Sequence, residues 1–404
     1  MLTVGKPELL SPAGDYEKLA MAVAYGADAV YLAGTRYGMR AGAGNFSEEE
    51  LRRAVELCHS RGVKVHVTCN TVPRDDELAE LPAFLRFLDE IGADALIVAD
   101  VGVMDMAVRN APHCALHVST QTGVANYATA RVLHDMGASR VVLARELTLD
   151  EIADIRTHVP ESLELEVFVH GAMCVSFSGR CLLSNYLTGR DANRGMCAQP
   201  CRWKYHLMEE QRPGQFMEIS EDGGTYILNS RDLCMIGHIP EILAAGAHSL
   251  KIEGRAKSAY YAGAVTGAYR QAVDAAVAGR PLDPVWFREM ELISHRPYST
   301  GFYFDPAGPG QYDGSAMYFS DCEAAAFVES CGPDGTAVLT QRNKFCTGDE
   351  LSLMMPGAVP VTFTAGKMKN GDGETIESVP HPLMRFSMRL PVQAPTLSVI
   401  RKLK

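Results

Sequence analysis

The chain has 404 residues, of which 47% are hydrophobic and 22% charged, and this composition excludes a disordered or fibrous protein. The length exceeds what one compact core usually organises, so we expect a large domain followed by a smaller one. The sequence holds no run of roughly 18 apolar residues and no signal peptide, and its net charge is -11; it therefore predicts a cytoplasmic protein without membrane contact.

Short apolar runs alternate with amphipathic segments along the first 280 residues. Eight runs have the composition of buried strands: ELLSPAG (8–14), DAVYLAG (28–34), KVHVTCN (64–70), DALIVAD (94–100), LHVSTQ (116–121), RVVLARE (140–146), LELEVFVHG (163–171) and SLKIEG (249–254). Ser47 and Thr148 are expected to cap two of the helices between them, and Gly-Ala pairs to end several. Eight such units predict an α/β fold, a (β/α)8 barrel of the TIM type. An open doubly wound sheet is the alternative, but no G-x-G-x-x-G motif follows the first strand.

The seventh unit is the longest. Its segment YHLMEEQRPGQFMEISEDGGTYILNS (205–230) predicts an inserted β-rich excursion after the seventh strand, where the active sites of such barrels lie. TYILNS within it is an alternative strand that would displace one of the eight. After residue 300 the alternating runs predict a linker over 301–319 and a small all-β domain, a barrel or sandwich, over 320–404. The barrel domain then spans 1–300, with its long loops at 170–235.

Polar side chains stand at the ends of the predicted strands. They are Ser11, Asp15, Asn70, Asp100, Ser119, Thr120, Gln121, Arg145, Glu146, His170, Glu253 and Arg255. Taken singly, each is more often a helix cap or a structural group than a catalyst. Because the carboxyl ends of barrel strands meet at one face, they predict a polar mouth together, with His170 and Glu253 as candidate acid–base catalysts.

Five of the eleven cysteines fall in the seventh unit. They are Cys174, Cys181, Cys197, Cys201 and Cys234. A reducing compartment disfavours disulfides, and the wide spacing differs from the C-x2-C pairs of structural zinc sites. Thiolates supplied by several loops suit a four-iron four-sulfur cluster. Zinc and unligated thiols are the alternatives. A nucleophile at Cys174 with His170 as its base would leave the other four cysteines unexplained.

The stretch EVFVHGAMCVSFSGRCLLS (166–184) matches along its length the signature E-x-F-x-x-G-[SA]-[LIVM]-C-x4-G-x-C-x-[LIVM]-S. In this it resembles the collagenase-like peptidase family of unassigned mechanism. The resemblance extends to ELLSPAGD, GMCAQPCRW, LNSRDLCM and LKIEGR, from residue 8 to near residue 300. No H-E-x-x-H helix or G-x-S-x-G elbow supplies a peptidase mechanism.

Within that family the chain looks like the prephenate-dependent tRNA hydroxylases. This resemblance implies conversion of the wobble uridine of tRNA to 5-hydroxyuridine, with prephenate as cosubstrate. It also implies a four-iron four-sulfur cluster on Cys174, Cys181, Cys197 and Cys234, with Cys201 as the alternative to Cys197. The alternatives are a peptidase and, as in other relatives, a hydroxylase of ribosomal RNA or of a ubiquinone precursor. The ubiquinone type lacks the β domain expected here.

The chemistry of these substrates points to further groups. Uracil C5 offers no easy acid–base route to hydroxylation, so a redox centre is required, and an electron-donor protein is a candidate partner. The two carboxylates of prephenate match arginine forks, which makes Arg145 and Arg255 candidate binding residues. In the alternative, these arginines form structural ion pairs with Glu146 and Glu253.

The charge distribution favours the C-terminal domain as part of the tRNA contact. Residues 341–404 hold nine Lys and Arg against five Asp and Glu, although the whole chain is acidic. The candidate contact residues are Arg342, Lys344, Lys367 and Lys369.

Overall fold

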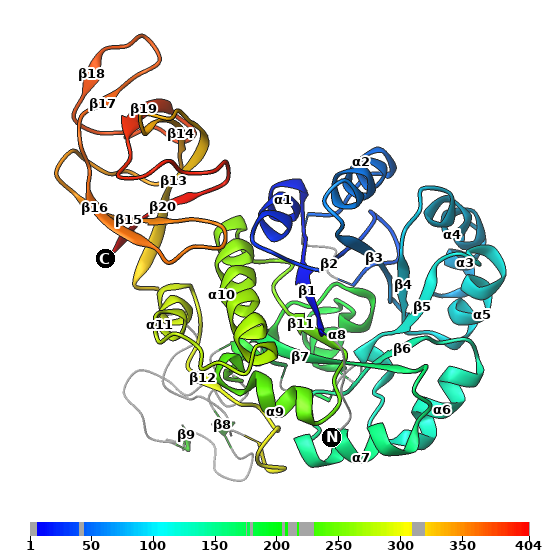
Figure 1. The fold of residues 1–404 in the computed structure, drawn as a ribbon. Coiled ribbons are helices and arrows are strands. Elements are labelled where there is room, and N and C mark those ends of the chain that lie inside the picture. The colour runs from blue at the N-terminus through cyan, green and yellow to red at the C-terminus, as the bar shows by residue number, and fades with distance from the viewer. Residues whose placement is uncertain are drawn as a thin grey trace.

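The computed structural model describes residues 6–39, 44–174, 176–177, 181–203, 207–208, 216–217, 230–308 and 320–403. Its larger part is a barrel of eight parallel strands surrounded by helices (Figure 1). The strands are β1 (Glu8–Pro12), β2 (Ala29–Leu32), β3 (Lys64–Cys69), β4 (Ala95–Val98), β5 (Ala115–Val118), β6 (Arg140–Val142), β7 (Glu164–Ala172) and β11 (Ser249–Ile252). Strand β11 pairs with both β7 and β1, which closes the barrel. The predicted (β/α)8 barrel and its eight strands are confirmed.

Helices connect the strands on the outside of the barrel. They are α1 (Tyr16–Ala24), α2 (Glu48–His59), α3 (Asp75–Leu78), α4 (Leu81–Glu90), α5 (Val101–Asn110), α6 (Tyr127–Asp135), α7 (Leu149–His158), α9 (Ile239–Ala244) and α10 (Ala259–Val277). Ser47 and Thr148 form capping boxes at the starts of α2 and α7, as predicted. The Gly-Ala pairs supply Gly26, Gly92, Gly137 and Gly246, all with φ between 80° and 103°, the range that favours glycine.

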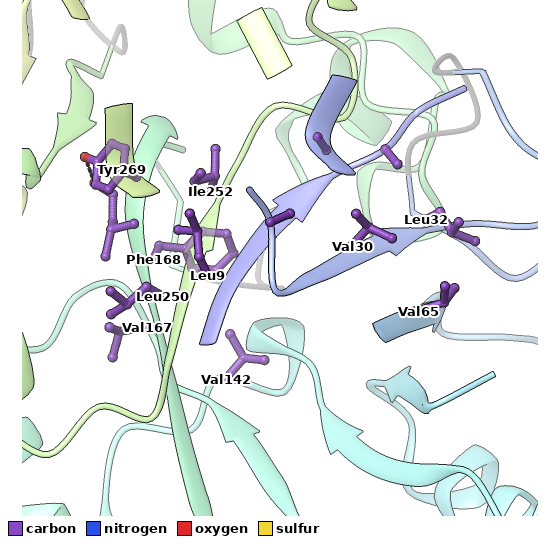
Figure 2. Packing of buried hydrophobic residues seen from close by; sticks show 14 of the residues in the cluster. Leu9, Val30, Leu32, Val65, Val142, Val167, Phe168, Leu250, Ile252 and Tyr269 are labelled. Carbon is purple, nitrogen blue, oxygen red and sulfur yellow. Dashed lines mark hydrogen bonds between the residues drawn. The ribbon is translucent and has the colours of Figure 1, made fainter. Parts of the chain in front are cut away.

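The strands send alternate side chains to the two faces of the barrel wall. Leu9, Val167 and Leu250 belong to the buried apolar cluster that includes residues of the surrounding helices, among them Tyr269 (Figure 2). The intervening positions face inward. Because two-residue periodicity governs each strand, charged inward positions on neighbouring strands come into contact.

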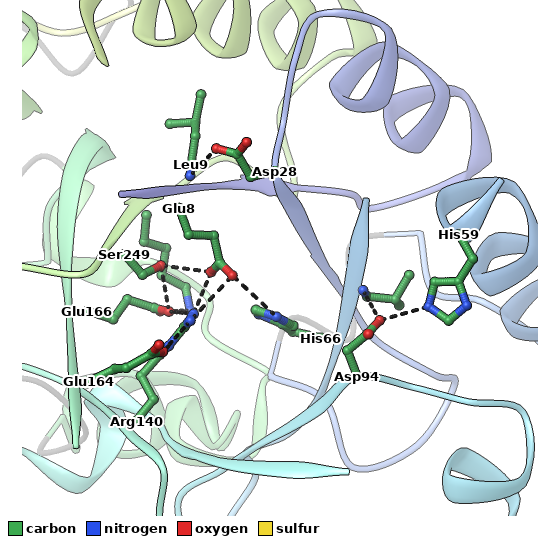
Figure 3. A network of polar contacts seen from close by, with 12 residues as sticks. Glu8, Leu9, Asp28, His59, His66, Asp94, Arg140, Glu164, Glu166 and Ser249 are labelled. Atoms are coloured by element: carbon green, nitrogen blue, oxygen red, sulfur yellow. Dashed lines mark hydrogen bonds and ion pairs between the residues drawn. The ribbon is translucent and has the colours of Figure 1, made fainter. Parts of the chain in front are cut away.

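A charged network occupies part of the inside of the barrel (Figure 3), beside a small apolar cluster of Leu10, Ala29, Tyr31 and Ile97. Arg140 donates hydrogen bonds to Glu8, Glu164 and Glu166, and Lys251 Nζ lies 2.7 Å from Glu166 Oε1. Burial alone would raise the pKa of Glu166, but Lys251 and Arg140 outweigh it and lower the pKa to about 2. His66, 3.9 Å from Glu8, has its pKa lowered to about 4 by burial.

The described residues of the long seventh unit include three short strands. Strand β10 (Asp232–Cys234) runs antiparallel to the end of β7, and β8 (Leu207–Met208) pairs with β9 (Phe216–Met217). Residues 225–229 of TYILNS lie outside the described residues, but the barrel already contains the eight predicted strands, so none is displaced. A buried ion pair between Asp232 and Arg296 holds β10 against β12 (Tyr298–Ser299).

Residues 320–403 form a separate antiparallel sheet of eight strands. They are β13 (Cys322–Cys331), β14 (Thr336–Gln341), β15 (Glu350–Met354), β16 (Val361–Thr364), β17 (Met368–Lys369), β18 (Thr375–Ile376), β19 (Arg385–Arg389) and β20 (Val399–Leu403), in the order β16-β15-β20-β13-β14-β19-β17-β18. The predicted all-β domain is confirmed as an antiparallel half-barrel. Residues 309–319 of the predicted linker lie outside the described residues.

The half-barrel is fixed to the side of the large barrel, next to α10 and α11 (Val285–Leu292) (Figure 1). Arg401 of β20, 1% exposed, donates hydrogen bonds to Glu289 of α11, which is 4% exposed. Tyr25 donates to the carbonyl oxygens of Met354 and Leu397, both at 3.2 Å. Buried charge pairing and apolar contact therefore join the two domains.

Candidate functional site

A cavity of about 570 Å³, part of it open to solvent, lies at the carboxyl ends of the barrel strands. Its lining consists of Tyr31, Met39, Thr68, Asn70, Ile97, Ser119, Thr120, Gln121, Arg145, Phe168, Lys251, Glu253 and Arg255. These residues come from seven of the eight strands or the loops that follow them. The cavity therefore occupies the position where barrel enzymes bind their substrates.

The structure brings together seven of the twelve polar residues predicted at the mouth. Those lining the cavity are Asn70, Ser119, Thr120, Gln121, Arg145, Glu253 and Arg255. Ser11 instead hydrogen bonds with Thr266, and Asp15 and Asp100 cap α1 and α5. Glu146 and His170 are also outside the lining. The positions of the strand ends thus predicted where the cavity lies. They did not distinguish residues that line it from residues that cap nearby helices.

Arg145 is the half-buried cation of the cavity wall. Its Nη1 donates to the carbonyl oxygen of Ala172 at 3.0 Å, and its guanidinium lies 5.0 Å from the centre of the Phe168 ring. No carboxylate pairs with it among the residues that the structure describes, so the alternative of an ion pair with Glu146 is not what the structure contains. A guanidinium held by a carbonyl and an aromatic face keeps donors for an anionic ligand.

Arg255 has a different environment, because only 3% of it is exposed. Its guanidinium donates to Thr68 Oγ1 at 3.0 Å and to the carbonyl oxygen of Met39 at 2.7 Å. A third bond, of 3.2 Å, reaches Asn45 Oδ1. Through these bonds Arg255 holds the segment after β2 against β3, so it has a structural role in the cavity wall.

The floor of the cavity contains groups that the sequence analysis missed. Lys251 Nζ lies 4.6 Å from the centre of the Tyr31 ring, and Tyr31 Oη donates to Glu253 Oε2 at 3.2 Å. Gly171 of β7, with φ of 110°, allows the backbone of β7 to lie close to that of Glu253, since a Cβ at position 171 would stand 2.3 Å from the Glu253 carbonyl oxygen. Lys251 lies on β11, and Glu253 follows directly after the strand, two residues later, so strand periodicity could have identified Lys251.

His170, a predicted acid–base candidate, is 1% exposed and lies among tyrosine rings. Its Nδ1 is 3.3 Å from the Tyr269 hydroxyl. Burial lowers the pKa of His170 to about 3, so its imidazole is neutral near pH 7. His170 therefore packs in the interior at the end of β7. Of the two acid–base candidates, only Glu253 lines the cavity.

The cysteines of the seventh unit lie at the same end of the barrel. Cys174 follows the carboxyl end of β7, and a bond between Arg194 and Glu77 ties the segment 181–203 to α3, which follows β3. Burial raises the pKa of the Cys201 thiol, and the nearby thiols of Cys174, Cys197 and Cys181 raise it further. Four of the five predicted thiols are therefore electrostatic neighbours.

Cys234 has other neighbours. It pairs with His170 across β10 and β7, and the Tyr269 hydroxyl donates to its sulfur at 3.9 Å. Over the described ranges, no three or more His, Cys, Asp or Glu side chains form a compact metal-binding group. The five cysteines of the seventh unit supply the right kind of donor for an iron–sulfur cluster, because thiolates are the ligands such clusters require. The choice of four ligands among the five stays a prediction.

The predicted RNA contacts of the C-terminal domain fall into two groups. Lys344, Lys367 and Lys369 are exposed. Arg342 instead bonds to Glu17 of α1 and lies 4.5 Å from the centre of the Phe327 ring, so it contributes to the contact between domains. None of the helices in the described part of the chain is long and apolar enough to cross a membrane.

Comparison with known proteins places this architecture in a family. The model of peptidase family U32 matches residues 14–312, and that of the U32 C-terminal domain matches residues 320–401. The tRNA hydroxylation protein P of Escherichia coli K12 is 37% identical over 418 residues, covering 93% of this chain and 92% of that protein.

Two further similarities have narrower coverage or lower identity. The 23S rRNA 5-hydroxycytidine C2501 synthase of Escherichia coli K12 is 39% identical over 273 residues, 68% of this chain and 40% of that protein. A solved U32 peptidase structure aligns with a TM-score of 0.41 and 16% identity, over 63% of this chain and 96% of that one. Since the two U32 models together match both the barrel and the half-barrel, the chain belongs to peptidase family U32.

Proposed function

We propose that this protein is a tRNA hydroxylase that converts the wobble uridine to 5-hydroxyuridine, with prephenate as cosubstrate. The observation that carries the proposal is the similarity to tRNA hydroxylation protein P over nearly the full length of both chains. The cationic cavity and the thiols at one end of the barrel are in keeping with it. A peptidase would need a nucleophile or metal motif, which the sequence does not supply.

The proposed cofactor is a four-iron four-sulfur cluster held by Cys174, Cys181, Cys197 and Cys234, with Cys201 as the alternative to Cys197. When bound, the cluster supplies one-electron chemistry that side chains lack. The protein's own contribution is binding and orientation: Arg145 provides a cation for a carboxylate, and Glu253, fixed by Tyr31, can accept a proton at the cavity floor.

The test is nucleoside mass spectrometry on RNA from a strain lacking this gene. We expect 5-hydroxyuridine and its derivatives to disappear from tRNA and to return with the intact gene. Ribosomal RNA from the same cells tests the second candidate, which the likeness to the 23S rRNA synthase supports. Loss of 5-hydroxycytidine from ribosomal RNA with unchanged tRNA would replace the tRNA proposal, and loss of ubiquinone alone would indicate the quinone-type activity.

Replacing Arg145 with alanine is expected to raise the KM for prephenate about 10- to 100-fold, because a charge-assisted hydrogen bond contributes roughly 1.5–3 kcal/mol. Arg145→Lys keeps the charge but loses the planar fork, so an intermediate effect is expected. The measurement is 5-hydroxyuridine formed at varied prephenate concentration. Arg131→Ala, at an exposed arginine of α6, is the control. An unchanged KM in Arg145→Ala would remove this residue from the cosubstrate site.

Reversing Lys367 and Lys369 together to glutamate is expected to weaken tRNA binding and to flatten its salt dependence. Each lost phosphate contact lowers the slope of log K against log salt by about 0.7–0.9. The matched control is Arg61→Glu with Lys64→Glu, exposed residues at the opposite end of the barrel from the cavity. If both double variants bind equally well across the salt range, the half-barrel does not contact the RNA.

A further inference from the structure

The segment that carries the cysteines has exposed aromatic side chains and several arginines. Tyr186 is 85% exposed, Trp203 45% and Phe177 41%. Such rings are usually buried, and a large exposed apolar group marks an interaction surface. We name Phe177, Tyr186, Trp203, Arg190 and Arg202 the aromatic–arginine surface.

Tyr186, Arg202 and Trp203 come from one compact unit. Helix α8 (Leu183–Thr188) carries Tyr186 and packs against the 3-10 turn Pro200–Arg202, which directly precedes Trp203. The amide of Ala198 donates to Ser184 Oγ at 2.9 Å, which joins the two parts. Because the backbone of this unit is bonded internally while its rings face solvent, the rings are available to a partner.

The charge of the segment differs from that of the whole protein. Residues 176–203 contain four arginines, one of which, Arg194, is paired with Glu77, against the single acidic residue Asp191, although the chain has a net charge of -11. Arg190 is exposed, and its Nε donates to the carbonyl oxygen of Met196 at 3.2 Å, which orients the guanidinium. Aromatic rings interleaved with arginines favour a polyanion with planar groups, which is single-stranded nucleic acid.

We propose that the aromatic–arginine surface binds the unpaired bases that flank the target nucleotide of the substrate RNA. This inference rests on the proposed RNA hydroxylation and adds the residues that hold the RNA. A base that reacts in a cavity must leave its stack, which removes stacking energy from its neighbours. Tyr186 and Trp203 replace part of that stacking at the barrel mouth, while Arg190 and Arg202 approach the phosphates.

The chain has only two tryptophans, which gives a direct readout. Trp286 is 9% exposed in α11, so Trp286→Phe leaves Trp203 as the single tryptophan, which selective excitation of indole reads out in the otherwise intact holoprotein. Titration with an RNA stem-loop is expected to quench Trp203 emission, and the same stem as a blunt duplex without a loop is not. Anisotropy of the labelled RNA reports binding independently.

Four outcomes are distinguishable in this titration. Quenching by the loop alone supports the proposal. Binding of the stem-loop without any change in Trp203 emission would overturn it and leave the RNA function intact. Absence of RNA binding would remove the proposed function itself. A response to phosphatidylglycerol vesicles, with none to RNA, would identify the surface as a membrane contact.

Substitution gives the second test. Tyr186→Ala is expected to raise the Kd for the stem-loop about 5- to 150-fold, as for loss of one stacked base, whereas Tyr186→Trp keeps a ring and retains the affinity. Since Tyr186 is 85% exposed, its truncation leaves the fold intact. The control is Tyr127→Ala on α6, a ring that is 39% exposed on the outside of the barrel. Equal effects of Tyr186→Ala and Tyr127→Ala would also overturn the proposal.

Discussion

Protein carrying Cys174→Ser is expected to be colourless after anaerobic purification and to lose more than about 100-fold in 5-hydroxyuridine formation. Removing a ligand has a larger effect than the 10- to 100-fold typical of groups that only support ligands. Cys174 is the exposed cysteine directly after β7, so its replacement leaves the barrel intact. The measurements are visible absorbance, bound iron and product formation.

The same measurements decide which four cysteines bind the cluster. Cys174, Cys181, Cys197 and Cys201 are electrostatic neighbours, whereas the resemblance to known hydroxylases favours Cys234 as the last ligand. Cys234→Ser should therefore be colourless, whereas of Cys197→Ser and Cys201→Ser only one should lose its colour. Cys331→Ser, on β13 of the half-barrel, is the control. A colourless wild-type protein with stoichiometric zinc would contradict the iron–sulfur proposal altogether.

Glu166→Gln is expected to destabilise the protein by about 3–5 kcal/mol at pH 7, because it leaves Arg140 and Lys251 without their shared buried carboxylate. Glu164→Gln is the matched control: it lies on the same strand and bonds to the same arginine, but its side chain is 44% exposed. Its effect should stay within about 1 kcal/mol. Urea unfolding followed by circular dichroism measures both, and equal effects would show that burial does not govern the network.

The pH dependence of the Glu166 effect has a defined sign. The pKa of Glu166 is lowered on folding from its ordinary value of 4.5 to about 2. Its ionised form therefore stabilises the fold above pH 4.5, and this contribution is lost as the pH falls toward 2. The difference in stability between wild type and Glu166→Gln should accordingly be full at pH 7 and shrink below pH 4.5. A difference that stays constant in acid would contradict the ionised state of Glu166.

The sequence predicted the barrel well because each βα unit carries its own local signals. Ser47 and Thr148 cap helices through bonds within three residues, and Gly26 and Gly92 end helices through their own φ angles. Such signals do not depend on distant parts of the chain. The polar mouth could also be predicted once the strands were known, since the carboxyl ends of the strands of a closed barrel lie at one face.

The partners of the charged residues could not be predicted, because they depend on contacts between distant segments. Glu166 and Lys251 are 85 residues apart, and Arg255 reaches Asn45 across 210. Sequence alone offered neighbouring Glu146 as the partner of Arg145, and the structure gives a carbonyl oxygen and the Phe168 ring in its place. Pairing across a barrel follows from strand register, which local composition does not encode.

The buried pair between Glu289 and Arg401 links the evolution of the two domains. One charge belongs to the barrel and the other to the half-barrel, and each is at most 4% exposed. Loss of the half-barrel would remove the partner of Glu289 and expose it to solvent, whereas a change of Arg401 alone would bury an unpaired carboxylate. Positions 289 and 401 are therefore expected to covary among relatives that retain both domains. In relatives that retain only the barrel, residue 289 is expected to vary as solvent-exposed residues do.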